Sequence, residues 1–418
     1  MLPRHRPTAR GGRTAACLAA LVLIGSLTTA APAEAAGPEP TFGSAANFPA
    51  GDSPFSVLVE DLTGDALPDL AVANFGTTHI SVLPAGGPGT FLAPVPHGIG
   101  TDEPVSGTPV GVVAGDLNGD GITDLVTANV NVAAVSVLLG TGGGAFAPAV
   151  AVPTGEDPAS VAMADLNGDG RADLVTADTN AVPPAASVLL GNGDGTFQAA
   201  TSLPTSTNPS GVAVADFNRD LVPDVAVTNL ASATMSVRLG NGDGTFKAPL
   251  HTAVGTAPGR IVAADLDGDG NPDAVVANKE SDSLSVLLGN GDGTFEAAAP
   301  VVTSDGPTSL ASADLNGDAI PDLVAVTTGS TAILGLVGEG DGTFTPRTIE
   351  RVSEAGTQAH PVAVAAGDLD GDDRPELVTA NLAGNDVSVL RNTTTPPVPA
   401  PAPATGYRLV AADGGVFG

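Results

Sequence analysis

The sequence is poor in several residue types that many binding sites need. Aromatic residues make up 3% of the 418 residues, with no tryptophan and one tyrosine, so a carbohydrate site built on stacked rings is poorly supplied. Basic residues number 15 against 46 acidic ones, which gives a formal net charge of −31. A chain this acidic repels phosphate backbones, so we expect no nucleic-acid partner.

Small and branched apolar residues are plentiful. Hydrophobic residues make up 42% of the chain, most of them alanine, valine and leucine, alongside 54 glycines and 36 prolines. A high net charge favours disorder only when such residues are scarce. The sequence therefore predicts a folded chain with a core of small side chains.

The first residues have the composition of a secretory leader. Basic residues from Arg4 to Arg13 precede an apolar stretch, Ala15–Thr29, and Ala33-Glu34-Ala35 fits a small-x-small cleavage site. We predict that residues 1–36 are a signal peptide of the bacterial Sec type, and that the protein is extracellular with no membrane insertion. A membrane anchor is the alternative, but a span needs about 20 apolar residues. Cleavage would remove Cys17, the one cysteine, so disulfides could not stabilise the secreted chain.

An acidic nonapeptide recurs seven times. Its pattern has Asp at the first position, Asn, Asp or Thr at the third, Asp at the fifth and an acid at the ninth. The first positions are 55, 49, 51, 49, 49 and 54 residues apart. A period of this length with strand-like units is typical of β-propellers. The seven segments begin at Asp61, Asp116, Asp165, Asp216, Asp265, Asp314 and Asp368.

Each period contains four short β runs. In the fifth unit they are Ile261–Ala264, Ala274–Ala277, Leu284–Leu288 and a fourth run that starts at Phe295. The acidic nonapeptide lies between the first two runs, and the glycine-rich Gly289–Thr294 lies between the last two. We therefore predict an all-β fold, a seven-bladed β-propeller of four-stranded antiparallel blades.

The ends of the array predict how the ring closes. The seventh unit has three β runs and no fourth, whereas Thr41–Phe48 resembles the missing run. We expect this N-terminal strand to complete the last blade and cover its edge. The predicted propeller spans residues 37–392. Residues 393–405 read as a Pro/Thr/Ala-rich linker, and residues 406–418 as a short remnant of a second repeat type.

The repeat unit resembles a known family. Val-Ala-x-x-Asp-Leu-Asn-Gly-Asp-Gly-x-x-Asp-Leu-Val, followed by Ser-Val-Leu-Leu-Gly-Asn-Gly-Asp-Gly-Thr-Phe, is similar to the FG-GAP/VCBS repeat, which also forms the N-terminal propeller of integrin α subunits. The resemblance implies a propeller with calcium in the Asp-rich loops. It implies no particular ligand, because one fold carries many functions.

The chemistry of the nonapeptides also points to calcium. Side chains at positions 1, 3, 5 and 9 and a backbone carbonyl near position 7 supply the hard oxygen ligands that calcium prefers, and three or four nearby carboxylates would repel without a cation. An EF-hand is excluded because position 12 carries no glutamate and strands flank the loop. Asx turns are the alternative. The predicted ligands of up to seven calcium ions are Asp61, Asp65, Asp69, Asp116, Asn118, Asp120, Asp124, Asp165, Asn167, Asp169, Arg171, Asp173, Asp216, Asn218, Asp220, Asp224, Asp265, Asp267, Asp269, Asn271, Asp273, Asp314, Asn316, Asp318, Asp322, Asp368, Asp370, Asp372 and Glu376.

The seven loops are not equivalent. We expect weaker sites in the first, fourth and seventh loops, which depart from the pattern at Thr63, Leu221 and Asp373. In the fourth loop, Arg219 would also place a positive charge close to the cation.

No catalytic motif stands out. The histidines after the leader are scattered and have no metal-ligand spacing. We predict a monomeric, calcium-stabilised, non-catalytic module for binding or adhesion, with an extracellular protein or polysaccharide as its ligand. A propeller enzyme, such as a polysaccharide lyase or hydrolase, and a lectin are the alternatives. The binding loops are expected opposite the calcium loops, at Thr101–Pro109, Val130–Val135, Asp178–Ala186 and Glu350–Pro361.

Overall fold

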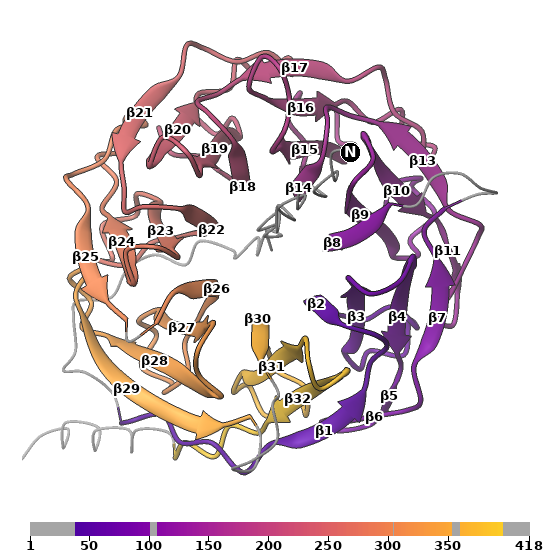
Figure 1. Ribbon diagram of the computed structural model, residues 1–418, viewed down its shortest axis with the longest axis vertical. Coiled ribbons are helices and arrows are strands. Elements are labelled where there is room, and N and C mark those ends of the chain that lie inside the picture. The colour runs from indigo at the N-terminus through magenta and orange to yellow at the C-terminus, as the bar shows by residue number, and fades with distance from the viewer. Residues whose placement is uncertain (1–37, 101–106, 304, 353–359, 396–418) are drawn as a thin grey trace, which may run out of the picture.

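Seven four-stranded antiparallel sheets stand in a ring, as Figure 1 shows. The computed structural model describes residues 38–100, 107–303, 305–352 and 360–395, and these residues contain no helix. It follows that none of them forms an apolar helix long enough to cross a membrane. The all-β, seven-bladed prediction is confirmed. The predicted leader and C-terminal remnant, most of the linker and parts of two predicted binding loops lie outside the described residues.

The first four blades follow one another along the chain, each beginning with its innermost strand. Blade 1 consists of β2 (Pro54–Glu60), β3 (Asp69–Asn74), β4 (His79–Leu83) and β7 (Val95–Gly98). Blade 2 consists of β8 (Thr108–Gly115), β9 (Asp124–Val130), β10 (Ala134–Leu138) and β13 (Val150–Pro153). Blade 3 consists of β14 (Pro158–Ala164), β15 (Asp173–Asp178), β16 (Ala185–Leu189) and β17 (Thr201–Pro204). Blade 4 consists of β18 (Pro209–Ala215), β19 (Asp224–Asn229), β20 (Thr234–Arg238) and β21 (Leu250–Ala253).

The remaining blades repeat this order until the ring closes. Blade 5 consists of β22 (Pro258–Ala264), β23 (Asp273–Asn278), β24 (Ser283–Leu287) and β25 (Ala299–Val302). Blade 6 consists of β26 (Pro307–Ala313), β27 (Asp322–Thr327), β28 (Ala332–Gly338) and β29 (Phe344–Arg351). Blade 7 consists of β30 (Pro361–Gly367), β31 (Glu376–Asn381), β32 (Asp386–Leu390) and the N-terminal β1 (Ala46–Pro49).

The core lies between blades. Each second strand is buried along its whole length, because both of its faces pack against neighbouring sheets, and this explains its runs of valine, alanine and leucine. A typical cluster joins Val275 and Leu284 of blade 5 to Leu310 and Leu323 of blade 6. Burial between sheets is thus the main source of cohesion around the ring.

In blade 5 the fourth strand begins later than the sequence predicts, whereas in blade 6 it starts at the equivalent phenylalanine, Phe344. In blade 5, Phe295 forms an isolated bridge with Gly289, and the outer strand β25 starts at Ala299. In blades 1 and 2 the same place holds two-residue ladders, β5 (Ala85–Gly87) with β6 (Thr90–Phe91) and β11 (Gly140–Gly142) with β12 (Ala145–Phe146). The prediction of a strand from Phe295 is wrong: this phenylalanine forms only the bridge with Gly289 and packs against the core between blades 4 and 5, and the outer strand begins four residues later, at Ala299.

The N-terminal strand closes the ring as predicted. β1 pairs with β32 from Ala46 opposite Val389 to Pro49 opposite Asp386, and Phe42 bridges Asn392. The pairing continues beyond the predicted end of the propeller, because the Thr393 N–H donates to the Thr41 carbonyl at 2.7 Å. The two ends of the propeller are therefore held in one blade.

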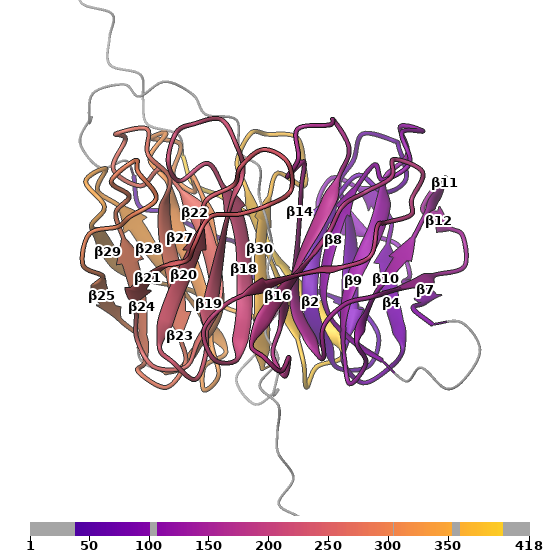
Figure 2. The same cartoon turned by 90° about the horizontal axis from the view of Figure 1, so that it is seen from above.

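Connections gather at the two ends of the ring, which Figure 2 shows edge-on. In an antiparallel meander, the loops after the first and third strands lie at one end and those after the second and fourth at the other. The acidic nonapeptides and the glycine-rich turns therefore share one end, called the acidic end from here on. The connections at the opposite end are mostly shorter but vary more in length from blade to blade.

Candidate metal centre

Each acidic loop joins the first strand of a blade to the second. Its ninth position is the first residue of the second strand, and in every blade this carboxylate is fully buried. A buried carboxylate needs hydrogen-bond donors or a cation to hold its charge. The residues at this position are Asp69, Asp124, Asp173, Asp224, Asp273, Asp322 and Glu376.

The ninth-position carboxylate connects the loop to its own blade. In blade 5, Asp273 Oδ2 accepts the Leu266 N–H at 2.7 Å, and Asp273 Oδ1 accepts the Gly289 N–H at 2.7 Å. Blade 6 repeats this arrangement with Asp322, Leu315 and Gly338. Both carboxylate oxygens are used, so one side chain ties the start of the loop to the end of the third strand.

The second position connects the loop to the next blade. Its side chain, a leucine in six loops and Phe217 in the fourth, is buried in the core shared with the following blade. In the second, fourth and seventh loops its carbonyl accepts an N–H from the glycine-rich turn of that blade: Gly195 to Leu117 at 3.0 Å, Gly293 to Phe217 at 3.0 Å and Gly89 to Leu369 at 2.9 Å. Each acidic loop therefore lies on a joint between two blades.

The first position folds the loop back on itself. Asp314 accepts the N–H groups of Gly317, Asp318 and Ala319 at 2.7, 3.2 and 2.8 Å. These are Asx-type contacts, so the turn chemistry weighed from the sequence is present in the loop. They leave the outer lone pairs of the carboxylates for a further ligand.

Two loops bring three carboxylates together. In the fifth loop, Asp265, Asp267 and Asp269 each offer an oxygen within 4.8 Å of the others, and the seventh loop does the same with Asp368, Asp370 and Glu376. No other group of three such ligands occurs among residues 38–100, 107–303, 305–352 and 360–395.

The raised pKa values of several loop acids indicate that the protein alone balances their charge poorly. Burial raises the pKa of Asp267, and the nearby charges of Asp269 and Asp265 raise it further. Burial also raises the pKa of Asp273 and Asp322 to about 7, although two backbone N–H groups oppose the shift in each case. A bound cation would favour the ionised forms.

Two unpartnered atoms fit a cation of the calcium type. Asp370 Oδ1 and Thr63 Oγ1 are buried without a hydrogen-bond partner in the described part of the chain, and both occupy the third position of their loops. The donors are all oxygen atoms, which suits calcium or magnesium and not zinc. The residues of the loops therefore fit the metal that the sequence predicts.

Arginines compete for some of these oxygens. In the seventh loop, Arg374 pairs with Asp372, and Arg391 Nη1 lies 3.4 Å from Asp370 Oδ2. In the fourth loop, Arg219 does not stay over its own nonapeptide, because its Nη1 donates to Asn271 Oδ1 of the fifth loop at 3.2 Å. The positive charge expected at the fourth loop thus lies closer to the fifth.

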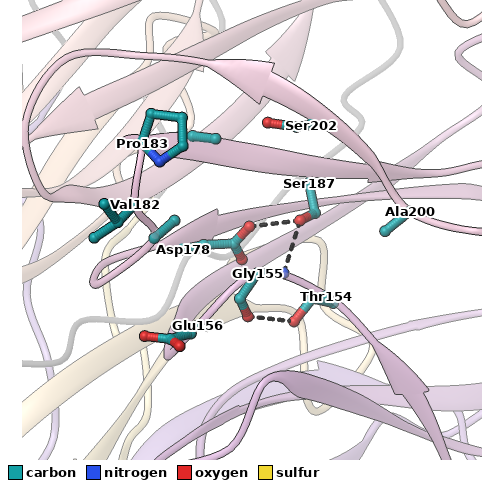
Figure 3. A pocket seen from close by; sticks show the side chains of 11 residues that line it. Thr154, Gly155, Glu156, Asp178, Val182, Pro183, Ser187, Ala200 and Ser202 are labelled. Carbon is teal, nitrogen blue, oxygen red and sulfur yellow. Dashed lines mark hydrogen bonds between the residues drawn. The ribbon is translucent and has the colours of Figure 1, made fainter.

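A second polar site, at the opposite end of the ring, includes part of the predicted binding loop Asp178–Ala186, but its buried carboxylate was not predicted from the sequence. A hollow of about 440 Å³ in blade 3 is lined by Glu156, Asp178, Val182, Ser187 and Ser202, among others (Figure 3). At the place of Asp178, the sequence has asparagine in blades 1, 2, 4, 5 and 7. Aligning the repeats could have found it: the counterparts are Asn74, Asn129, Asn229, Asn278 and Asn381.

Asp178 is fully buried and interacts with neutral donors. It accepts the Thr176 hydroxyl at 2.7 Å and the Ser187 hydroxyl at 2.5 Å. Burial raises its pKa to about 6, and these two hydroxyls oppose the shift only in part. Glu156, the other acid of the hollow, offers no compensating charge.

Asp178→Asn is expected to stabilise the protein at pH 8 by about 2–3 kcal/mol. It removes a carboxyl whose pKa the fold raises by about two units, to about 6, and which is therefore costly to ionise at pH 8. The raised pKa favours the protonated carboxyl in the fold, so wild-type stability is lost as the pH rises through 6. Asparagine fits this place, because blade 5 has it at the equivalent position. There the Ser285 hydroxyl accepts the Asn278 amide at 2.9 Å and also the backbone N–H of Gly255. Urea unfolding at pH 4 and pH 8 measures the effect.

The difference between the two proteins should shrink to about 0.5 kcal/mol near pH 4, where the carboxyl is protonated in the folded chain and about half ionised in the unfolded chain. A variant that is equally stable to wild type at pH 8, or less stable, would show that Asp178 carries no buried charge.

Comparisons with known proteins agree with this architecture. A family model described as FG-GAP-like repeat matches residues 61–127, 116–176, 180–227, 222–276, 265–325 and 314–379. No curated protein matches the sequence. Among solved structures, BBS1N in complex with ARL6DN is similar at 12% identity with a TM-score of 0.58, covering 85% of this chain and 98% of that one. A lectin from Agrocybe aegerita that recognises non-reducing terminal N-acetylglucosamine is similar at 22% identity with a TM-score of 0.51, covering 80% and 87%. At these identities the likeness concerns the fold alone.

Proposed function

The chain belongs to the FG-GAP-like repeat family, and from that premise we propose that it is a secreted, calcium-stabilised propeller that acts as a non-catalytic binding or adhesion module. One observation carries the proposal: every acidic loop lies on a joint between two blades. A cation bound there would hold neighbouring blades together.

The proposed role of calcium is structural. Extracellular calcium modules bind with dissociation constants of about 10⁻⁴ to 10⁻³ M. Millimolar calcium would then stabilise each of the tighter loops by about 1.4 kcal/mol. With no disulfide available after cleavage of the leader, several such sites would take over the stabilising role that disulfides have in other secreted proteins.

Ligand binding is proposed at the end opposite the acidic loops. Connections there vary in length, and the hollow of blade 3 opens among them beside the loop that joins β15 to β16. Loops held by a rigid scaffold commonly carry recognition. An extracellular protein or polysaccharide would be the partner.

Calcium stoichiometry tests the proposal. The purified protein is dialysed against buffered calcium and the bound metal is counted per chain. We expect several ions, and a count of zero at millimolar calcium would contradict it. A turnover assay on acidic polysaccharides, with and without calcium, separates the binding module from a propeller enzyme, since only an enzyme forms product.

Asp267→Asn is expected to weaken calcium binding in the fifth loop by about tenfold, because ligand charge sets affinity in such sites. The same change should slightly stabilise the calcium-free protein, since it removes one of three crowded carboxylates. Asparagine at this position is natural to the chain, as in Asn167 and Asn316. Calcium titration and melting in chelator measure the two effects.

The two effects of Asp267→Asn must have opposite signs. Unchanged calcium binding would mean that the fifth loop holds no ion, and a lower melting temperature in chelator would mean that the cluster is not repulsive. Glu280→Gln, a charge change in the loop between β23 and β24 at the opposite end, serves as the matched control.

A further inference from the structure

One arginine side chain places a buried positive charge in the interior of the ring. Arg260 lies on β22, the innermost strand of blade 5, and its residue is 5% exposed. Its Nη2 lies 3.5 Å from the Ser56 hydroxyl on β2, the innermost strand of blade 1. Blades 5 and 1 are not neighbours, and their inner strands face each other across the axis in Figure 1. The guanidinium therefore lies near the axis of the propeller.

The charge of Arg260 has no counter-ion. Among the described residues, no carboxylate pairs with it, and its Nε is buried without any hydrogen-bond partner. The contact with Ser56 is at the long limit of a hydrogen bond. Burial alone lowers the pKa of the guanidinium to about 9. An unpaired buried charge is strongly unfavourable, so it needs a reason other than stability.

Packing does not supply that reason. The other six inner strands have small residues at the equivalent place, two positions after the proline at or near the strand's start. A long apolar side chain could fill the same space at the axis without a charge. The six residues are Ser56, Gly111, Ser160, Gly211, Ser309 and Ala363.

We propose that Arg260 binds a small oxyanion at the axis of the propeller, a free inorganic anion or the carboxylate of an organic ligand. The planar guanidinium offers two parallel N–H donors, which match the geometry of such groups. The Ser56 hydroxyl, already near the guanidinium, supplies a further donor from the opposite side of the ring. This site is separate from the acidic loops and goes beyond the proposed calcium-dependent function.

Isothermal titration with sulfate and with acetate tests the proposal. The secreted protein is kept in millimolar calcium, and sodium chloride holds the ionic strength constant. We expect saturable binding of at least one probe with one site per chain. Sulfate binding would point to an inorganic anion, and preferential acetate binding to an organic carboxylate. The absence of saturable binding for both would overturn the proposal.

Three variants show whether the binding residue is Arg260. Arg260→Met keeps the length of the side chain and should lower the affinity at least tenfold, whereas Arg260→Lys keeps the charge without the planar fork and should give an intermediate value. Ser56→Ala leaves the guanidinium in place and should weaken binding several-fold, so it decides the question if Arg260→Met does not fold. Wild-type affinity in the folded Arg260 variants, or in Ser56→Ala, would contradict the site.

Discussion

Leu266→Ala is expected to destabilise the propeller by about 3–5 kcal/mol, both in calcium and in chelator. Leu266 occupies the second position of the fifth acidic loop and is 1% exposed. It packs with Leu310 and Leu323 of blade 6, so its truncation leaves a cavity on the joint between the two blades. Urea unfolding in both buffers measures the loss.

Leu92→Ala is the matched control. Leu92 follows the short hairpin of β5 and β6 in blade 1 at the acidic end, but its residue is 57% exposed, so its truncation should change stability by less than about 0.5 kcal/mol. If Leu266→Ala behaved like this control, the acidic loops would not be anchored in the core between blades. If Leu266→Ala lost stability in calcium but not in chelator, Leu266 would stabilise the fold by supporting the metal site.

The repeat pattern made most of the fold predictable. Seven copies of one unit reveal the blade count, and a seventh unit without its last strand predicts the closure by Thr41–Phe48 that the pairing of β1 with β32 confirms. The prediction of strands fails where the same local pattern is compatible with two structures. Phe295 reads as the start of a strand, yet it is a core residue at the end of a turn.

The positions of the acids in the loops could be read from the sequence, but the hydrogen bonds that they make could not. Spacing identifies the ninth-position carboxylates, and nothing in the spacing shows that Asp273 accepts N–H groups from both Leu266 and Gly289. Contacts between blades, such as Gly293 with Phe217, join residues far apart in the sequence. Such pairs depend on how neighbouring blades pack, which the spacing within one repeat does not encode.

Single departures from the repeat marked the two unexpected polar groups. Asp178 replaces an asparagine, and Arg260 replaces a small residue. Each departure is visible when the repeats are aligned, but its meaning depends on burial. Asp178 on the surface would be an ordinary acid, and Arg260 is unusual only because no carboxylate of the described chain neutralises it.

Removal of calcium is expected to cost about 4–7 kcal/mol of folding free energy, because the second, third, fifth and sixth loops each contribute about 1.4 kcal/mol at millimolar calcium. That sum is comparable to the whole stability of an ordinary domain, about 5–15 kcal/mol. This binding free energy already includes the relief of repulsion among carboxylates such as Asp265, Asp267 and Asp269.

A thermal melt of residues 37–418 in 5 mM calcium, roughly ten times a mid-range dissociation constant for such modules, and again in excess chelator tests the central claim most directly. Magnesium replaces calcium in a third sample, to separate a specific ion from a general effect of divalent charge. The account predicts a melting temperature that falls substantially in chelator and recovers when calcium, but not magnesium, is restored. The same melting temperature in all three samples would show that the acidic loops hold the ring together without a metal.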